Sequence, residues 1–384
     1  MIATRPALRP AAAFLLVLLA GLPQRALALP TMIRLGYTEC TACHLSPQGG
    51  GPLNTYGRGI DRAQSLRGGD LTEIDDLRRA LTFGGRTTQD LRTVLQEQAS
   101  RADGDSVQVR FWPRAIYRHV TEFGRGFRAS AVITAATDGG LRPSLSYDSR
   151  PASSPVFVNT ALLHYRVSRT AEIAAGRDQL PSGINVPDLG LWTKSRNRMG
   201  YYDAPAQLKM FWTGSRVHAA PFVYGPGGNE PAGARESGVG TTAEIAPGRR
   251  TVVGMSWLNA SASDGARRMI GGYVRLGFGR WGILAEHDVT ERTPAALAAQ
   301  PFQQRATYGQ VFWAVREWLV TSASGERLQV DRPFEEKLVA GKLEIAARLA
   351  SQVSIGVSTR LQRDQISGRL SASATLQAAF KTVQ

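Results

Sequence analysis

The stretch Ser367-Gly-Arg-Leu-Ser-Ala-Ser-Ala-Thr-Leu-Gln-Ala-Ala-Phe380 decides the fold. Its even positions from Gly368 to Phe380 are small or apolar, and its odd positions from Ser367 to Gln377 are polar or charged. Successive side chains of a β-strand point to opposite faces, so this alternation predicts a long strand with one apolar and one polar face.

The same period of two extends back through the chain to about residue 84. Sixteen segments show it: 84–98, 106–120, 126–138, 155–168, 170–179, 205–213, 216–224, 237–246, 250–262, 266–279, 281–292, 304–317, 318–330, 335–349, 351–362 and 366–380. Strands of soluble proteins are shorter, about five or six residues. Repeated long hairpins with one apolar face are typical of transmembrane β-barrels. We therefore expect residues 83–384 to form a mainly β, antiparallel transmembrane barrel of roughly 16 strands, with about 14 to 18 compatible. A soluble β-sandwich or solenoid is the alternative.

Aromatic side chains fall near the predicted strand ends, as in interfacial girdles. They are Trp112, Tyr165, Tyr201, Tyr202, Trp257, Trp281, Trp313 and Trp318.

The composition is strongly basic and almost free of cysteine. The 384 residues carry a formal charge of +15, and of 46 basic residues only five are lysine. Two cysteines are too few for a disulfide-stapled scaffold. A charge that faces lipid costs about 2–4 kcal/mol at the midplane, so we expect the basic residues of the strands to line the lumen. The residues in question are Arg110, Arg114, Arg118, Lys342, Arg348, Arg360 and Arg369, with Glu286, Asp288 and Glu344 as expected partners.

Residues 1–28 have the layout of a secretory signal peptide. Arg5 and Arg9 precede the apolar run 11–22, and Ala26-Leu27-Ala28 forms a small-residue cleavage site. An N-terminal membrane anchor is the alternative. Cleavage would lower the formal charge from +15 to +12 by removing Arg5, Arg9 and Arg25. An exported barrel is expected in the bacterial outer membrane, with membrane lipid and no nucleic acid as partner.

The two cysteines lie together in Cys40-Thr-Ala-Cys43-His44. Cys-x-x-Cys-His is the attachment motif of c-type haem: the two thiols form thioethers to the haem edge, and the adjacent histidine binds the iron. A local disulfide, a thioredoxin-like redox pair and half of a zinc site are the alternatives. We predict one covalent haem c, with Cys40, Cys43 and His44 as cofactor-binding residues and His44 as metal ligand. The haem-binding segment, residues 29–82, is too small to enclose a haem by itself, so it is expected to act as a plug in the barrel lumen.

The second axial ligand of the iron stays open at this level. His164 and His218 share polar strand faces, and Met32 is near the motif in sequence, so the sixth ligand is one of these three or none. His119 and His287 are out of phase with their polar neighbours. Arg58 is either a partner for a haem propionate or an ordinary surface arginine, and a short helix is expected over 71–81.

The chain resembles the fused monohaem cytochrome c–porins of bacterial outer membranes, which are implicated in iron oxidation and extracellular electron transfer. The resemblance covers the whole layout, and locally Pro52-Leu-Asn54-Thr-Tyr56-Gly57-Arg58 is similar to the run that follows the haem motif in that family. It implies that Cys40 and Cys43 are the thioether attachments and His44 the proximal ligand. The stretch Met32–Tyr37 and the triple glycine Gly49–Gly51 differ from the iron-oxidising members.

These features favour an electron conduit between an extracellular donor or acceptor, such as Fe(II), and a periplasmic carrier such as a soluble cytochrome. No side-chain acid or base is predicted to act, and Fe(II) oxidase activity is left open. Two alternatives remain: a porin-like anion channel in which the haem plug is structural or gating, and a periplasmic cytochrome with a soluble β-domain.

Overall fold

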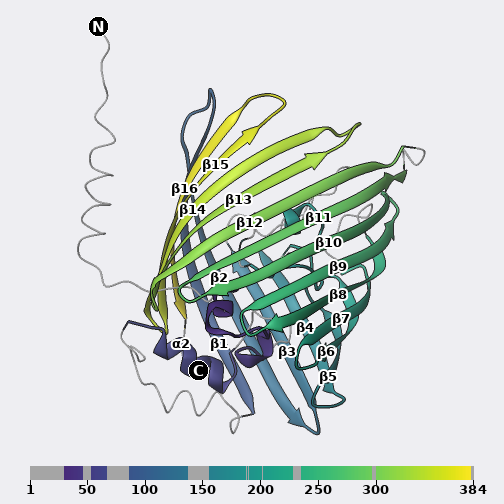
Figure 1. Ribbon diagram of the computed structural model, residues 1–384, viewed down its shortest axis with the longest axis vertical. Coiled ribbons are helices and arrows are strands. Elements are labelled where there is room, and N and C mark those ends of the chain that lie inside the picture. The colour runs from purple at the N-terminus through teal and green to yellow at the C-terminus, as the bar shows by residue number, and fades with distance from the viewer. Residues whose placement is uncertain are drawn as a thin grey trace.

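The computed structural model describes residues 30–45, 53–66, 86–136, 155–186, 188, 190–200, 202–227, 235–295 and 300–381 (Figure 1). The predicted signal peptide, the predicted helix at 71–81 and Tyr201 lie outside these residues. The described helices are short: η1 (Pro30–Leu35), η2 (Cys40–Ala42), α2 (Thr55–Ala63) and α4 (Trp192–Ser195). None of them is both long and apolar enough to cross a membrane.

Sixteen strands make up most of the described chain. They are β1 (Thr87–Ala102), β2 (Gln108–Gly124), β3 (Phe127–Ala136), β4 (Val156–Arg166), β5 (Ala171–Arg177), β6 (Ala206–Thr213), β7 (Val217–Gly225), β8 (Ser237–Gly248), β9 (Thr251–Ala262), β10 (Gly265–Phe278), β11 (Trp281–Pro294), β12 (Phe302–Arg316), β13 (Leu319–Val330), β14 (Glu336–Ala350), β15 (Val353–Asp364) and β16 (Leu370–Lys381). Each pairs antiparallel with its neighbours in sequence, and β1 pairs with β16 to close the barrel, with Arg92 opposite Lys381. The predicted fold and strand number are confirmed, although several boundaries shift by a few residues.

The two faces of the strands lie as the alternation predicts. On β16, Leu370, Ala372 and Leu376 are exposed on the outer surface, whereas Ser373 and Thr375 line the interior. Trp281 and Trp313 stack on the outside, with their ring centroids 5.2 Å apart. An apolar outer face on a closed barrel, which leaves no unpaired strand edge, is the arrangement that a lipid bilayer requires. The protein is an outer-membrane β-barrel.

Two of the predicted girdle residues are not on the outer surface. Trp112 lines the interior cavity, because it shares the inward-facing positions of β2 with Arg114 and Arg118. Tyr202 is buried inside the barrel and packs edge-on against Phe157.

The two ends of the barrel differ in the length of their connections. At one end, turns of only two residues join β2 to β3, β8 to β9 and β10 to β11. The start of β1 and the end of β16 lie at the same end. Outer-membrane barrels have short periplasmic turns and longer extracellular loops, so we assign this end to the periplasm.

One long loop from the opposite end folds into the lumen. This loop, residues 178–205, joins β5 to β6, and its Leu180, Ile184 and Trp192 are each buried against the inner wall in a different hydrophobic cluster. Polar contacts also hold it: the Lys194 ammonium is 2.7 Å from Glu286 Oε1, and the Trp192 amide donates to Glu326 Oε2 over 2.8 Å. The position of this loop inside the barrel was not predicted from the sequence.

The N-terminal segment lies across the periplasmic mouth. Ile33 is buried in a cluster with side chains of β8 to β13 and of the loop 178–205, and Arg34 pairs with Glu317 in the turn between β12 and β13 (2.6 Å). On the other side of the mouth, Asp61 of α2 pairs with Arg348 (2.5 Å) and Lys381 (3.3 Å). The described part of the predicted plug therefore lies at one end of the lumen, and the loop 178–205 occupies its middle (Figure 1).

Candidate functional site

The Cys-x-x-Cys-His motif forms a single tight turn. The amides of Cys43 and His44 both donate to the carbonyl oxygen of Cys40, over 3.2 and 2.9 Å. Both cysteines are free thiols, so the structure holds no local disulfide at this motif. The turn places two thiols and an imidazole within five consecutive residues of one compact unit.

The start of helix α2 and the residue before it, Asn54, pack against this turn, with Asn54 and Gly57 making the contacts. The Asn54 amide donates to the carbonyl oxygen of Cys43 (3.0 Å), and its side-chain amide donates to that of Ala42 (3.1 Å). A Cβ atom on Gly57 would lie 2.1 Å from the Cys43 carbonyl oxygen, so only glycine allows this approach. The run Asn54–Arg58 thus fixes the motif from outside, a role that sequence reasoning missed although an Asn-x-x-Gly cap could have signalled it.

Arg58 forms hydrogen bonds within its own segment. Its guanidinium donates to the carbonyl oxygen of Leu53 (3.0 Å) and to Thr55 Oγ1 (3.2 Å). These two hydrogen bonds join Arg58 to residues near it in the sequence.

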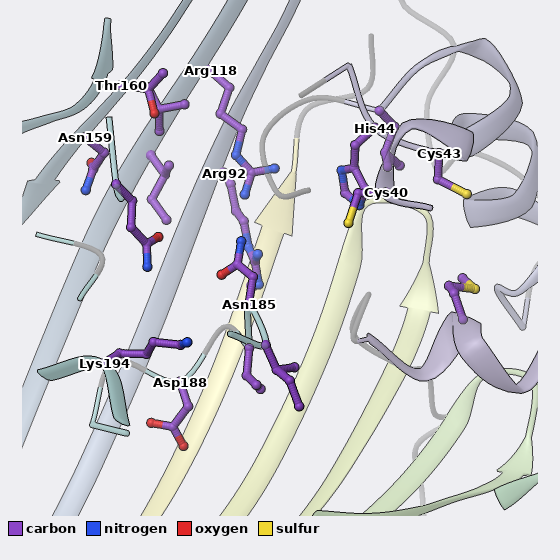
Figure 2. Close-up of a pocket in the computed structure, with 18 of the residues that line it drawn as sticks. Cys40, Cys43, His44, Arg92, Arg118, Asn159, Thr160, Asn185, Asp188 and Lys194 are labelled. Atoms are coloured by element: carbon purple, nitrogen blue, oxygen red, sulfur yellow. The ribbon is translucent and has the colours of Figure 1, made fainter. Parts of the chain in front are cut away.

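The motif opens onto a large interior cavity. Cys40, Cys43 and His44 line a cavity of about 1080 Å³ together with side chains from the barrel wall and from the loop 178–205. Figure 2 shows Cys40 and His44 at one side of this cavity, with Arg92 and Arg118 beside them in the view and Asp188 and Lys194 farther along. The cavity is larger than most small-molecule sites, which occupy about 300–1,000 Å³.

The donor groups of the motif suit a covalently attached haem. Burial raises the pKa of both thiols, and for Cys40 the guanidinium of Arg275 opposes this rise only in part. The cysteines are therefore protonated thiols at neutral pH. No group of three or more His, Cys, Asp or Glu side chains in the described ranges is placed to hold a metal ion, so nothing there completes a zinc site. Two thiols and one imidazole at an interior cavity fit haem c.

All three candidates for the sixth ligand line the same cavity, but their surroundings differ. His164 Nδ1 is 2.8 Å from Glu172 Oε1, and its Nε2 is 2.8 Å from Ser130 Oγ. Both of its nitrogens are thus engaged by side chains of neighbouring strands. Met32 and His218 lie nearer the motif in the fold: His218 Nε2 is 3.8 Å from Glu39, the residue before Cys40.

The other two histidines lie on the outside of the barrel. His119 bonds to Tyr117 and Thr121 on the outward positions of β2, and the exposed His287 bonds to Thr307 on β12 (2.8 Å). The phase argument against them is confirmed.

The cavity wall carries more positive than negative side chains. Ten arginines and lysines line it against seven aspartates and glutamates. Arg114, Arg118, Lys342, Arg348 and Arg360 are among them, as predicted. The prediction for Arg369 is wrong: it lies in the turn before β16 and pairs with Asp105 over 2.6 Å. Arg110 is exposed near the far end of β2 and does not line the cavity.

Of the three acidic residues expected to pair with basic residues of the wall, one does so and the other two bind side chains of the loop 178–205. Glu344 pairs with Lys342 (2.7 Å), as expected. Glu286 pairs instead with Lys194 of the loop, and Asp288 accepts a hydrogen bond from Asn197 of the same loop (3.2 Å).

Comparison with known proteins places the fold among outer-membrane porins and channels. No protein-family model matches the chain, and no curated protein is similar to it in sequence. Among solved structures, it is similar to the anion-selective porin from Comamonas acidovorans (TM-score 0.56, 10% identity, 77% of this chain and 100% of that chain). It is also similar to OprB of Pseudomonas putida (0.58, 8%, 79% and 96%) and to the loop L8 deletion mutant of OmpT from Vibrio cholerae (0.58, 9%, 77% and 100%). At these identities the likeness shows the fold alone, a porin-like barrel of the bacterial outer membrane.

Proposed function

We propose that this protein is an outer-membrane electron-transfer protein whose single c-type haem is attached at the periplasmic mouth of the barrel. The observation that carries the proposal is the Cys40–His44 turn, with two free thiols and an adjacent imidazole at an interior cavity. A bound haem would supply one-electron redox chemistry at this position.

Different residues of the chain would attach such a group and hold the turn that carries it. Cys40 and Cys43 would tether it covalently, and His44 would bind the iron. Asn54 and Gly57 keep the turn in one geometry by packing α2 on it. Arg92 and Arg118 line the adjacent cavity, with Arg118 3.6 Å from Asp90, and guanidinium groups at this place could bind the haem carboxylates.

The position of the site has a consequence for electron exchange. The hydrocarbon core of a membrane is about 30 Å thick, so one haem cannot reach partners on both sides directly. A soluble periplasmic carrier would approach the site at the mouth. An extracellular donor or acceptor, Fe(II) among them, would have to reach it through the cavity beside the loop 178–205.

The proposal is tested by an optical spectrum of the protein purified from outer membranes, air-oxidised and then titrated with ferrous iron. We expect a c-type spectrum, and haem that stays with the polypeptide on a denaturing gel. The variant Cys40→Ala/Cys43→Ala should lose both signals while keeping the barrel, and Gly272→Ala on the outer wall should keep both. Absence of haem from the wild type would overturn the proposal. A haem that ferrous iron cannot reduce would remove Fe(II) as donor and leave the conduit.

A second candidate function is a porin-like channel that prefers anions. It is supported by the excess of basic residues on the cavity wall and by the porin-like fold, which one solved anion-selective porin shares. A basic lumen lowers the energy of anions relative to cations.

Conductance in planar bilayers tests this candidate. Under a KCl gradient, the reversal potential of an anion-preferring pore has the same sign as the chloride equilibrium potential. The variant Arg114→Gln/Arg118→Gln should move this reversal potential towards zero. The matched control is Arg363→Gln, which removes an exposed arginine at the end of β15. No measurable conductance in the full-length protein, or equal effects of the two variants, would contradict the channel function.

A further inference from the structure

The periplasmic end of the barrel carries a ring of exposed arginines. One lies in or directly beside each of the six turns from β2–β3 to β12–β13: Arg125, Arg169, Arg216, Arg249, Arg280 and Arg316. Two of these turns carry a second exposed arginine, Arg166 and Arg250. We call this set the arginine rim.

The arginine rim has few acidic neighbours among the described residues. None of these arginines takes part in an ion pair within the described ranges, and the exposed acidic residues beside the six turns are Glu122 and Glu317. Glu317 is already paired with Arg34. Among the described residues, these six turns therefore carry a net positive charge.

The extracellular end is organised differently. Among the described residues at this end, several charges of opposite sign form ion pairs, as in Arg369–Asp105 (2.6 Å), Arg198–Asp264 (2.8 Å) and Lys337–Glu335 (2.8 Å). A need for solubility alone does not explain why the two ends differ. The arginines of the rim therefore indicate a binding partner on the periplasmic side.

The segment that leads into the Cys-x-x-Cys-His motif contacts the same turns from inside the ring. Arg34 bonds to Glu317 beside Arg316, and Gly36 lies against the backbone of Arg249. Glu39 is 3.8 Å from His218, two residues after Arg216. A protein seated on the rim would thus lie directly against the haem-binding segment.

We propose that the arginine rim is the docking surface for a soluble periplasmic electron carrier with an acidic face around its own redox centre. This inference rests on the proposed electron-transfer function and adds the sign and location of the contact. Opposite charges accelerate encounter and orient the partners, and transient redox complexes of this kind need only a small interface. Their association weakens as salt shortens the Debye length from about 30 Å at 0.01 M to about 8 Å at 0.15 M.

The experiment uses one redox protein in two charge states. Mitochondrial cytochrome c is basic, and succinylation of its lysines makes it acidic while the haem fold is retained. Binding of each form to the full-length protein, held in nanodiscs of zwitterionic lipid, is measured at both ionic strengths. We expect the acidic form to bind at low ionic strength with at least a tenfold loss of affinity at the higher one, and the basic form not to bind.

A pair of charge-matched variants locates the contact. The rim variant Arg216→Gln/Arg249→Gln/Arg280→Gln should weaken binding of the acidic form about tenfold or more. The control Arg101→Gln/Arg332→Gln/Arg369→Gln removes three exposed arginines near the extracellular end and should leave binding within about twofold of the wild type. Equal effects of the two variants, or equal binding of the two probes, would overturn the proposal.

Two further measurements separate this proposal from its competitors. If the rim variant loses binding to anionic phosphatidylglycerol vesicles but keeps its affinity for the acidic probe, the rim binds lipid headgroups and the docking proposal fails. The haem-free variant Cys40→Ala/Cys43→Ala should still bind the acidic probe, since the rim does not depend on haem. A wild type that lacks haem yet binds the probe would refute the proposed function while supporting the rim as a docking surface.

Discussion

The loop 178–205 lies in the middle of the lumen and the N-terminal segment lies across its periplasmic mouth, and the two are held in different ways. The loop contributes side chains to three separate hydrophobic clusters and places a charged group, Lys194, in the buried interior. The N-terminal segment adds one side chain, Ile33, to one of these clusters, packs its backbone against Gly277, and forms ion pairs through Arg34 and Asp61.

Because they are held differently, the loop and the N-terminal segment should differ in whether they unfold together with the barrel. A loop that shares the interior cluster of the wall should unfold together with the barrel, because its burial is part of the same cooperative core. A segment that contributes only one side chain to these clusters should be displaceable while the barrel stays intact. The following predictions test that contrast, from the largest expected effect to the smallest.

The largest effect is expected for the buried ion pair between the loop and β11. Lys194→Met leaves the Glu286 carboxylate buried without its counter-charge, which costs about 3–5 kcal/mol of unfolding free energy. Denaturant unfolding in detergent measures it. The double variant Lys194→Met/Glu286→Gln should recover most of the loss, because it removes both charges and keeps an acceptor for the Ile184 amide. A single variant as stable as the wild type would show that the loop is not part of the core.

A smaller and more local effect is expected where the N-terminal segment crosses β10. A Cβ atom on Gly277 would lie 2.5 Å from the Ile33 carbonyl oxygen and 2.6 Å from Arg34 Cα. Gly277→Ala should therefore weaken docking of the segment by about 1–3 kcal/mol. Faster proteolysis within residues 30–66, at unchanged barrel stability, is the expected result.

The matched control for this change lies on the same strand. A Cβ atom on Gly272 would meet nothing within 4 Å, so Gly272→Ala should leave the proteolysis rate unchanged. If Gly277→Ala lowers barrel stability as much as it loosens the segment, then the segment and the barrel form one cooperative unit.

The loop contact at Asp188 should depend on pH. Burial acts to raise the pKa of Asp188, but the ammonium of Lys342 and the Gly190 amide outweigh it, so the pKa is lowered. A lowered pKa contributes stability above the ordinary value of about 3.9, and this contribution is lost as the pH falls through the folded-state pKa. The unfolding free energies of the wild type and Asp188→Asn should differ by roughly 1 kcal/mol at pH 7, a small effect because Lys342 keeps Glu344 as a partner. The two values should converge as the pH falls below about 4 and through the lowered folded-state pKa. A pH-independent difference would contradict this origin.

The smallest effect is expected at the contact between Glu39 and His218. The pair is long, at 3.8 Å, and the Glu39 side chain is one-third exposed. Glu39→Gln should change docking of the N-terminal segment by about 0–1 kcal/mol. Proteolysis of the segment should stay within about twofold of the wild type, and a change as large as that of Gly277→Ala would indicate a stronger contact than the geometry implies.

Prediction from sequence succeeded where a local repeat carried the information. The alternation in β16 placed Leu376 on the lipid side and Thr375 on the inside, and the same rule placed His119 and His287 outside. Trp112 was placed wrongly because its residue type was given more weight than its position in the alternation. Its even position on β2 matches that of Arg114, which lines the cavity. The motif Cys40–His44 was found because its residues are consecutive.

The sequence by itself determined the barrel, the two faces of its strands and the residues of the Cys-x-x-Cys-His motif, because each of these depends on spacing along a single stretch of chain. Only the tertiary structure decided that the loop 178–205 fills the lumen, that the motif lies at the periplasmic mouth, and that Glu286 pairs with Lys194 rather than with an arginine of the wall. These contacts join residues far apart in sequence, and they exist only once the closed barrel brings its strands and its loop around a common interior.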